Sequence, residues 1–342
     1  MVSIKDVAKV AGVSDKTVSR VANKEGNVHP ETAEKVNEAI RKLGYVPNMT
    51  ARMMRSSRST TFGILTDYVS TTPYSGDIVR GIQDWANENN KTVLMANTNG
   101  DKEREIETWR TFQEHRIQGV LFVTMYHRII DPVPSSVQIP TVLVNSHPSK
   151  KRKYHSIEPD DYQGSTDLAK YIIQLGHRKI GYIRLNPALL GAELRIDAFR
   201  KVARDSGLSQ TDLTVRLGME GPIGNENNRV YQEAIDILSG PNRPTALVCG
   251  NDEMAFQAYL AALRLGLRIP EDLTIVGFDD FRLISLGLKP QLTTVALPYY
   301  DLGLKGAELL NRVLLGESPD SKHEKLHCPL VVRGSSSSVS LL

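Results

Sequence analysis

The chain has 342 residues, more than one ordinary domain contains and enough for two or three. Its composition, 40% hydrophobic and 24% charged, is typical of a soluble globular protein, and no apolar run approaches the roughly 20 residues of a membrane span. The N-terminus has no long apolar segment, so we expect no signal peptide. Two cysteines, Cys249 and Cys328, argue against a secreted disulfide framework and favour the cytoplasm.

Positive charge is concentrated near the N-terminus. Residues 1–60 hold 11 Lys and Arg against 6 Asp and Glu, whereas the rest of the chain holds 31 against 33. A basic segment of this kind is typical of a small nucleic-acid-binding domain attached to a neutral body. On charge alone, a solvated basic face is the alternative.

Three short amphipathic helices are predicted in this basic segment. Apolar residues at i, i+3, i+4 and i+7 place the first helix at residues 4–11, and Gly12 ends it. Ser14 can cap the second helix, because its hydroxyl can accept a free backbone N–H. The third helix begins at Pro30 and ends at Gly44. The first two helices and their tight turn predict a helix-turn-helix, and all three can bury one small core.

The start of the second helix has side chains suited to DNA. In a helix-turn-helix these positions meet base edges in the major groove. Arg20 can donate two parallel bonds to guanine, and Asp15 can accept from cytosine. Hydroxyl and amide side chains suit phosphate contacts. The alternative to DNA binding is that the three helices form a protein-binding module. The candidate DNA contacts are Ser14, Asp15, Lys16, Thr17, Ser19, Arg20 and Asn23.

Residues 4–55 read "IKDVAKVAGVSDKTVSRVANKEGNVHPETAEKVNEAIRKLGYVPNMTARMMR", and the similarity described next covers this segment without a gap. It is similar to the DNA-binding head and hinge of the lac-repressor family of bacterial transcription regulators. In that family, the hinge becomes a short helix in the minor groove when two copies meet on DNA. The resemblance places Met54 where an apolar side chain wedges into a base step and kinks the duplex, and Arg55 at the adjoining basic position. Packing of the methionines against the body is the alternative.

From Phe62 onward, short apolar runs alternate with helical patterns. Such an alternation predicts parallel sheets with right-handed crossovers, and about 280 residues imply two lobes. Ligands of such sheets bind beyond the carboxyl ends of the strands. The polar residues that follow predicted strands are Asp67, Asn145, Asn251 and Asp279.

The resemblance continues through "DIVRGI", "LGHRKIGYI", "GNDEMAFQAYLAALRLGLRIPEDLTIVGFDD" and "PQLTTV". It implies a two-lobed, periplasmic-binding-protein-like α/β body with three crossovers and a small molecule in the cleft. "RIDAF" matches the family's ligand-clamping arginine motif, which gives Arg195. The residues implied as ligand contacts, by the resemblance and by the strand ends, are Asp67, Tyr74, Ser75, Asn145, Arg195, Glu220, Asn251, Asp279 and Tyr299.

These side chains suit a ligand with vicinal hydroxyls. A guanidinium donates two parallel bonds and a carboxylate accepts two, while a tyrosine ring can stack on an apolar sugar face. A mono- or disaccharide or glycoside is therefore favoured, with a purine or another metabolite second. Each residue could instead have a structural role in its loop. Nucleotide-loop, zinc and serine-hydrolase signatures are missing, so we expect no cofactor, no metal and no enzyme.

The predicted organisation has three parts: a small all-α head, a hinge and an α/β body for ligand binding and dimerisation. The first lobe of the body is predicted at residues 61–157 and 290–318, and the second lobe at 158–289 and 319–340. The head and the hinge are predicted at residues 1–47 and 48–60.

The predicted function is ligand-responsive transcription regulation, with repression favoured over activation. We expect a homodimer on double-stranded palindromic operator DNA, located in the cytoplasm and on the nucleoid when bound. No heptad repeat follows Arg333, so a tetramer-forming coiled coil is not expected. A soluble sugar-binding protein would need the two lobes but not the basic head. A sugar-modifying enzyme would need a phosphate loop or a catalytic base.

Overall fold

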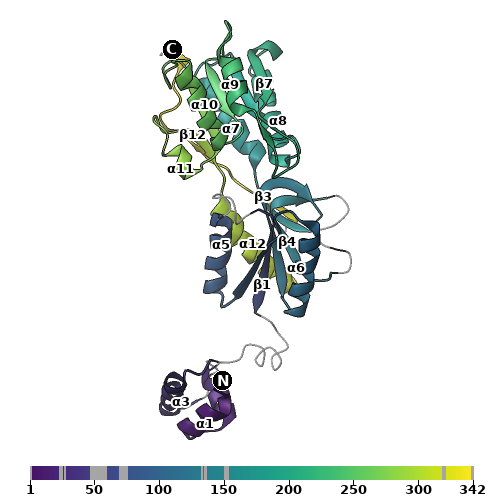
Figure 1. Cartoon of the computed structure of the whole chain (residues 1–342), viewed down its shortest axis with the longest axis vertical. Helices are drawn as coiled ribbons and strands as arrows, with labels where there is room; N and C mark the ends of the chain where they lie inside the picture. The colour runs from purple at the N-terminus through teal and green to yellow at the C-terminus, as the bar shows by residue number, and fades with distance from the viewer. Residues whose placement is uncertain are drawn as a thin grey trace. The chain divides into compact units, whose positions relative to one another are not determined.

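The structure is a computed structural model of the whole chain. It divides into two compact units, Met1–Ser59 and Thr60–Leu342 (Figure 1). The predicted DNA and ligand contacts Asn23, Met54, Arg55, Tyr74 and Ser75 lie outside the described residues. The structure describes residues 2–22, 26, 28–46, 60–68, 76–131, 134, 137–149, 154–317 and 321–339.

The first unit has three helices within residues 2–22 and 28–46. The helices are α1 (Ile4–Ala11), α2 (Asp15–Ala22) and α3 (Pro30–Leu43). Gly12 ends α1 with a φ of 66°, in the left-handed region that glycine adopts without a Cβ clash. The predicted helix-turn-helix is therefore confirmed. Its core consists of Val7, Ala8, Val18, Val36 and Ala39.

The first lobe of the second unit is built on a parallel sheet in the order β13-β5-β4-β3-β1-β2. Helices α5 (Gly76–Glu88) and α12 (Tyr299–Leu314) cover one face, and α6 (Lys102–Glu114) covers the other (Figure 1). Strand burial on both faces explains the continuous apolar runs in the sequence. The strands are β1 (Thr61–Thr66), β2 (Thr92–Asn97), β3 (Gly119–Ile130), β4 (Thr141–Pro148), β5 (His155–Pro159) and β13 (His323–Leu326).

The second lobe is built on a sheet in the order β14-β12-β11-β10-β6-β7, in which β14 (Leu330–Val331) is antiparallel to β12. Helices α7 (Asp161–Gln174) and α8 (Leu190–Asp205) pack on one face. Helices α9 (Val230–Leu238) and α10 (Asp252–Arg264) pack on the other. The remaining strands are β6 (Ile180–Arg184), β7 (Leu213–Leu217), β10 (Ala246–Cys249), β11 (Thr274–Asp279) and β12 (Thr293–Ala296).

Three smaller elements complete the second lobe. A short hairpin pairs β8 (Met219–Glu220) with β9 (Asn227–Asn228). A 3-10 turn, η2, covers Gln210–Asp212, and α11 covers Arg282–Ser285. The hairpin lies between β7 and α9 in the chain, so it is one of the connections at the cleft side of the second sheet.

The described chain passes between the lobes after β5, after β12 and after β13. These positions correct the lobe boundaries that the sequence predicted. Strand β12, within predicted first-lobe residues 290–318, pairs with β11 in the second sheet. Strand β13, within predicted second-lobe residues 319–340, pairs with β5 in the first sheet. A short apolar strand suits either sheet, so its pairing partner decides its lobe.

Both cysteines are buried and unpaired. Cys249 ends β10, and Cys328 lies between β13 and β14. Among the described residues, no helix has both the length and the apolar character needed to cross a membrane.

Candidate functional site

The start of α2 carries the candidate DNA contacts. Asp15, Lys16 and Arg20 are exposed, whereas Thr17 is half-buried. The Ser14 hydroxyl oxygen accepts from the backbone N–H of Thr17 over 3.2 Å and lies 2.9 Å from the Thr17 hydroxyl. Ser14 therefore caps α2, as predicted, and Asp15, Lys16 and Arg20 stay exposed to solvent.

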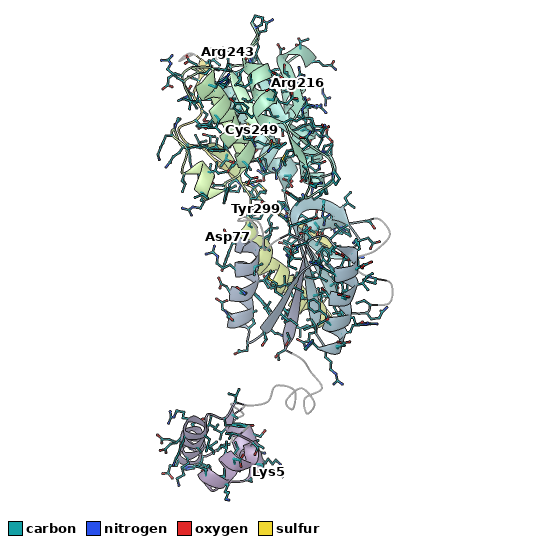
Figure 2. The ribbon with its side chains drawn as sticks, in the orientation of Figure 1. Lys5, Asp77, Arg216, Arg243, Cys249 and Tyr299 are labelled. Carbon is teal, nitrogen blue, oxygen red and sulfur yellow. The ribbon has the colours of Figure 1, made fainter. Side chains whose placement is uncertain are left out.

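A cleft lies where strands of both sheets end. Strands β3 and β4 of the first lobe and the segments that follow β6, β10 and β11 of the second form its walls. Tyr299, at the start of α12, lies at the junction of the two lobes (Figure 2). Open α/β sheets bind ligands at this position. The structure brings five predicted residues into the lining: Asn145, Arg195, Asn251, Asp279 and Tyr299.

Asp67, a predicted ligand contact, is not among the described residues that line the cleft. Its buried carboxylate accepts from the backbone N–H of Tyr68 over 2.7 Å and from that of Met125 over 3.1 Å. One terminal nitrogen of Arg128 lies 2.6 Å from its second oxygen. Asp67 therefore ties the end of β1 to β3, and its oxygens already have partners.

Glu220, another predicted ligand contact, is also not among the described residues that line the cleft. It is exposed on β8, and its carboxylate lies 4.0 Å from Arg229. The neighbouring residue, Met219, lines the cleft instead. Successive side chains of a strand point to opposite sides, so a difference of one residue decides which of the two faces the cleft.

Arg195 lies at the centre of a buried charge network. Its Nε donates to an oxygen of Asp161 over 2.7 Å, and one terminal nitrogen donates to the carbonyl of Gly250 over 2.7 Å. The same nitrogen lies 3.4 Å from an oxygen of Asp279. The guanidinium carbon lies 3.7 Å from the centre of the Phe278 ring. Arg195 is therefore held in place before any ligand binds.

The network continues from Asp161 into the first lobe. His127 Nδ1 lies 2.6 Å from an oxygen of Asp161, and its Nε2 lies 3.2 Å from Glu158. Burial lowers the pKa of His127, but bonds to both carboxylates outweigh burial and raise it to about 9. Burial raises the pKa of Asp161, but the charges of Arg195 and His127 lower it to about 2. The network therefore joins the lobes through the pair of His127 and Asp161.

Asp279 lies at the carboxyl end of β11 in an unusual conformation. Its φ is 110° and that of Asp280 is 51°, backbone angles that residues other than glycine rarely adopt. Burial raises the pKa of Asp279 to about 7, and the nearby Arg195 opposes this rise only in part. The carboxyl group of the free protein therefore titrates near neutrality.

Two asparagines provide further polar groups. The Asn145 amide donates to the carbonyls of Thr124 and Met125 over 3.0 and 2.9 Å. Its side-chain oxygen is buried and has no hydrogen-bond partner among the residues that the structure describes. The Asn251 side-chain oxygen accepts from the backbone of Met254 over 2.9 Å and so caps α10. A ligand donor could satisfy the oxygen of Asn145.

Several lining residues lie outside the set predicted from sequence. Asn186 follows β6 at a strand-end position of the kind used for the prediction, whereas Tyr126 lies within β3, before the strand ends. Glu253 belongs to the first turn of α10, two positions after the predicted Asn251. Glu226 carries no local signal. The other lining residues are Met125, His127, Leu185, Leu189, Gly191, Ala192, Met219 and Leu297.

A helix-turn-helix unit and a two-lobed body with a polar cleft define a DNA-binding regulator that responds to a ligand. The chain matches the family of bacterial regulatory proteins, lacI family, over residues 3–48. It matches the periplasmic binding protein-like domain over residues 169–336.

Relatives of known name match nearly the whole chain. Catabolite control protein A of Priestia megaterium is 32% identical over 327 residues, which are 94% of this chain and 95% of that protein. The ribose operon repressor of Escherichia coli K12 is 31% identical over 340 residues, 98% of this chain and 100% of that protein. The chain therefore belongs to the lacI family of bacterial regulatory proteins.

Solved structures agree. A putative transcriptional regulator of this family from Rhizobium etli is 60% identical with a TM-score of 0.79, covering 82% of this chain and all of that one. The lac repressor dimer bound to operator and the anti-inducer ONPF is 25% identical with a TM-score of 0.82. That match covers 98% of this chain and 99% of the lac repressor chain.

Proposed function

We propose that the protein is a repressor that binds palindromic operator DNA as a homodimer in the cytoplasm. Its affinity for DNA is switched by a polyhydroxylated molecule, a mono- or disaccharide or glycoside, held between the lobes. The cleft binds this effector without chemical change. The observation that carries the proposal is the cleft lining, in which a fixed guanidinium faces carboxylates and amides at the carboxyl ends of both sheets.

The charges of the lining favour hydroxyl groups over phosphates. Glu226, Glu253 and Asp279 supply carboxylate acceptors, and the guanidinium of Arg195 already faces Asp161 and Asp279. Carboxylates accept bonds from hydroxyls but repel an anionic phosphate. The name of one relative, the ribose operon repressor, also supports a sugar. A purine is the second candidate, because two tyrosines of the lining could stack on a planar base.

A thermal-shift screen of sugars, glycosides and purines tests the effector class. A ligand that binds only the folded state stabilises it by about 2.7 kcal/mol at 100 times its Kd. We expect a sugar or glycoside to raise the melting temperature and Asp279→Ala to remove that shift. A shift from purines alone would move the assignment to the second candidate. A sugar shift unchanged in Asp279→Ala would place the site elsewhere.

Arg20→Ala is expected to weaken operator binding by ~1–3 kcal/mol, about 5- to 150-fold, and to relax the preference at one base position. The reason is that Arg20 is exposed one turn into α2, where a guanidinium can reach a guanine edge. Binding to a set of operators with single-base changes would measure both effects. Lys42→Ala, which removes an exposed charge from α3, is the control and should leave base preference unchanged. Uniform weakening on every sequence would assign Arg20 to a phosphate.

Asp279→Asn is expected to change how stability depends on pH. The folded pKa of about 7 lies above the unfolded value of about 3.9, so the folded state holds the proton more tightly. That contribution is complete below about pH 4 and is lost as pH rises through about 7. The melting temperature of Asp279→Asn relative to wild type should therefore rise between pH 4.5 and 7.5. The exposed control Asp301→Asn should show no such trend.

Exposed apolar side chains support the homodimer. Apolar side chains exposed along one helix face can pack against a second copy, and a two-fold dimer uses the same surface of both copies. On α10, Leu263 is 75% exposed. The other exposed apolar residues that we assign to the interface are Leu94 and Met95 of β2, Phe256 and Leu260 of α10, and Leu283 of α11.

Leu263→Glu is therefore expected to raise the dimer dissociation constant by at least roughly tenfold, because a charge would be buried against its own copy. Sedimentation analysis over a concentration series would measure it. Leu315→Glu, at a similarly exposed leucine after α12, is the matched control. Equal dissociation of both variants, or of neither, would remove α10 from the proposed interface.

A further inference from the structure

A cluster of metal-ligating side chains lies in the first lobe, outside the lining of the cleft. His147 belongs to β4, Glu158 to β5 and His323 to β13, three neighbouring strands of the first sheet. One ligand atom of each lies within 4.8 Å of the other two. None of the three is among the described residues that line the cleft. The cluster therefore lies outside the cleft lining and meets the charge network of Arg195 through the contact between Glu158 and His127.

Strand pairing brings the three side chains together. His323 pairs with Ser156 in the ladder between β13 and β5. Glu158 follows two positions after Ser156, so both point to the same face of the sheet. His147 lies at the end of β4, on the other side of β5, with Nδ1 2.8 Å from an oxygen of Glu158. Glu158 is therefore central, with one imidazole on each side.

The separations are close to those of a metal site. Ligand atoms about 2.0–2.2 Å from a tetrahedral ion lie about 3.3–3.5 Å from one another. Nδ1 of His147 is 2.8 Å and Nδ1 of His323 is 4.0 Å from the same oxygen of Glu158. The two imidazole rings lie 4.8 Å apart, centre to centre. Side-chain shifts smaller than ~1 Å would bring the three ligand atoms to the separations of a tetrahedral site.

The surroundings support the carboxylate as a ligand and leave the imidazoles partly exposed, with Nδ1 of His323 2.9 Å from the Ser156 hydroxyl, a contact that an ion would replace. The side chain of Glu158 is 2% exposed, whereas those of His147 and His323 are each 37% exposed. The second oxygen of Glu158 lies 3.2 Å from His127 Nε2, and the Ser156 hydroxyl donates to the first. Hydrogen bonds of this kind hold a ligating carboxylate in one orientation. An ion could reach the imidazoles from solvent.

We propose that His147, Glu158 and His323 bind a divalent transition-metal ion of the Zn²⁺ class, with water at the remaining position. Two imidazoles and one carboxylate suit Zn²⁺, Co²⁺ or Ni²⁺, whereas Mg²⁺ and Ca²⁺ take oxygen ligands. Three protein ligands leave the ion an open coordination position.

Calorimetry with Zn²⁺ on the tag-free, chelator-treated full chain tests the proposal. We expect one ion per chain. His323→Ala and His147→Ala should each weaken Zn²⁺ binding by more than the roughly 10- to 100-fold that follows loss of a residue that only hydrogen-bonds to a metal ligand. His115→Ala, at an exposed histidine elsewhere in the lobe, is the control and should bind as wild type does. Millimolar Mg²⁺ should not compete.

Cobalt provides a second readout that does not depend on stability. Co²⁺ in the wild-type chain should give visible absorption from low-symmetry coordination by nitrogen and oxygen, and His323→Ala should lose it while keeping the wild-type circular dichroism. Glu158 is too buried for a first test, so the two surface histidines carry the experiment. Absence of Zn²⁺ binding by the wild type, or binding that both histidine variants retain, would overturn the proposal.

Discussion

Arg195→Ala is expected to make DNA binding insensitive to the effector and to destabilise the body by roughly 3–5 kcal/mol. Arg195 is 5% exposed, and its loss leaves Asp161 buried with the charge of His127 as its remaining close ionic partner. The effector would also lose the fixed donor of the cleft. A ligand shifts a conformational equilibrium only by its difference in affinity for the two states. Without the guanidinium, that difference should largely vanish.

Denaturant unfolding and operator binding with and without effector would measure the two effects separately. Arg195→Lys keeps the charge but loses the planar fork, so it should recover part of the stability and little of the response. Arg200→Ala, at an exposed position on the same helix, is the control and should change neither. A normal effector response in Arg195→Ala would contradict the proposed role of this side chain.

This expectation differs from the one that the sequence supports. From sequence, Arg195 is a ligand contact whose removal should leave operator binding intact. In the structure, Arg195 also neutralises Asp161 between the lobes, so its removal changes the free protein as well. Operator binding of Arg195→Ala therefore has to be compared with that of the wild type at a temperature well below the unfolding transition of the variant.

Gly303→Ala is expected to destabilise the first lobe by about 3 kcal/mol or more. Helices α5 and α12 pack backbone against backbone. A Cβ at Gly303 would lie 2.0 Å from the carbonyl oxygen of Ile78, and one at Gly81 would lie 2.1 Å from that of Tyr300. These are backbone atoms, which cannot rotate aside. The helices would have to separate, and the core between them and the sheet would lose contacts.

Separation of these helices should also weaken effector binding, because α12 begins at Tyr299 in the cleft. Thermal and denaturant unfolding would measure the loss of stability, and calorimetry would measure the loss of affinity. Gly240→Ala is the matched control, since a Cβ there meets no atom within 4 Å and its φ is not in the left-handed region. Wild-type unfolding of Gly303→Ala would show that the helices can move apart without loss.

Local features of the fold were predictable because they follow from neighbouring residues. Gly12 and Ser14 delimit the helix-turn-helix through backbone conformation and a hydrogen bond spanning three residues. Alternating strands and helices implied parallel sheets, and the carboxyl ends of such strands meet at one edge. For that reason Asn145, Asn251 and Asp279 were found from sequence and do line the cleft.

The order of elements, the class of fold and three strand-end residues of the cleft could therefore be predicted without a structure. Tertiary structure alone decided which sheet takes β12 and β13, and that Asp67 is occupied by Arg128. It also decided that Arg195 and His127 meet Asp161 from positions 34 residues away on either side in the chain. Such contacts depend on how separate elements pack, and the spacing of residues along one element carries no information about its partner.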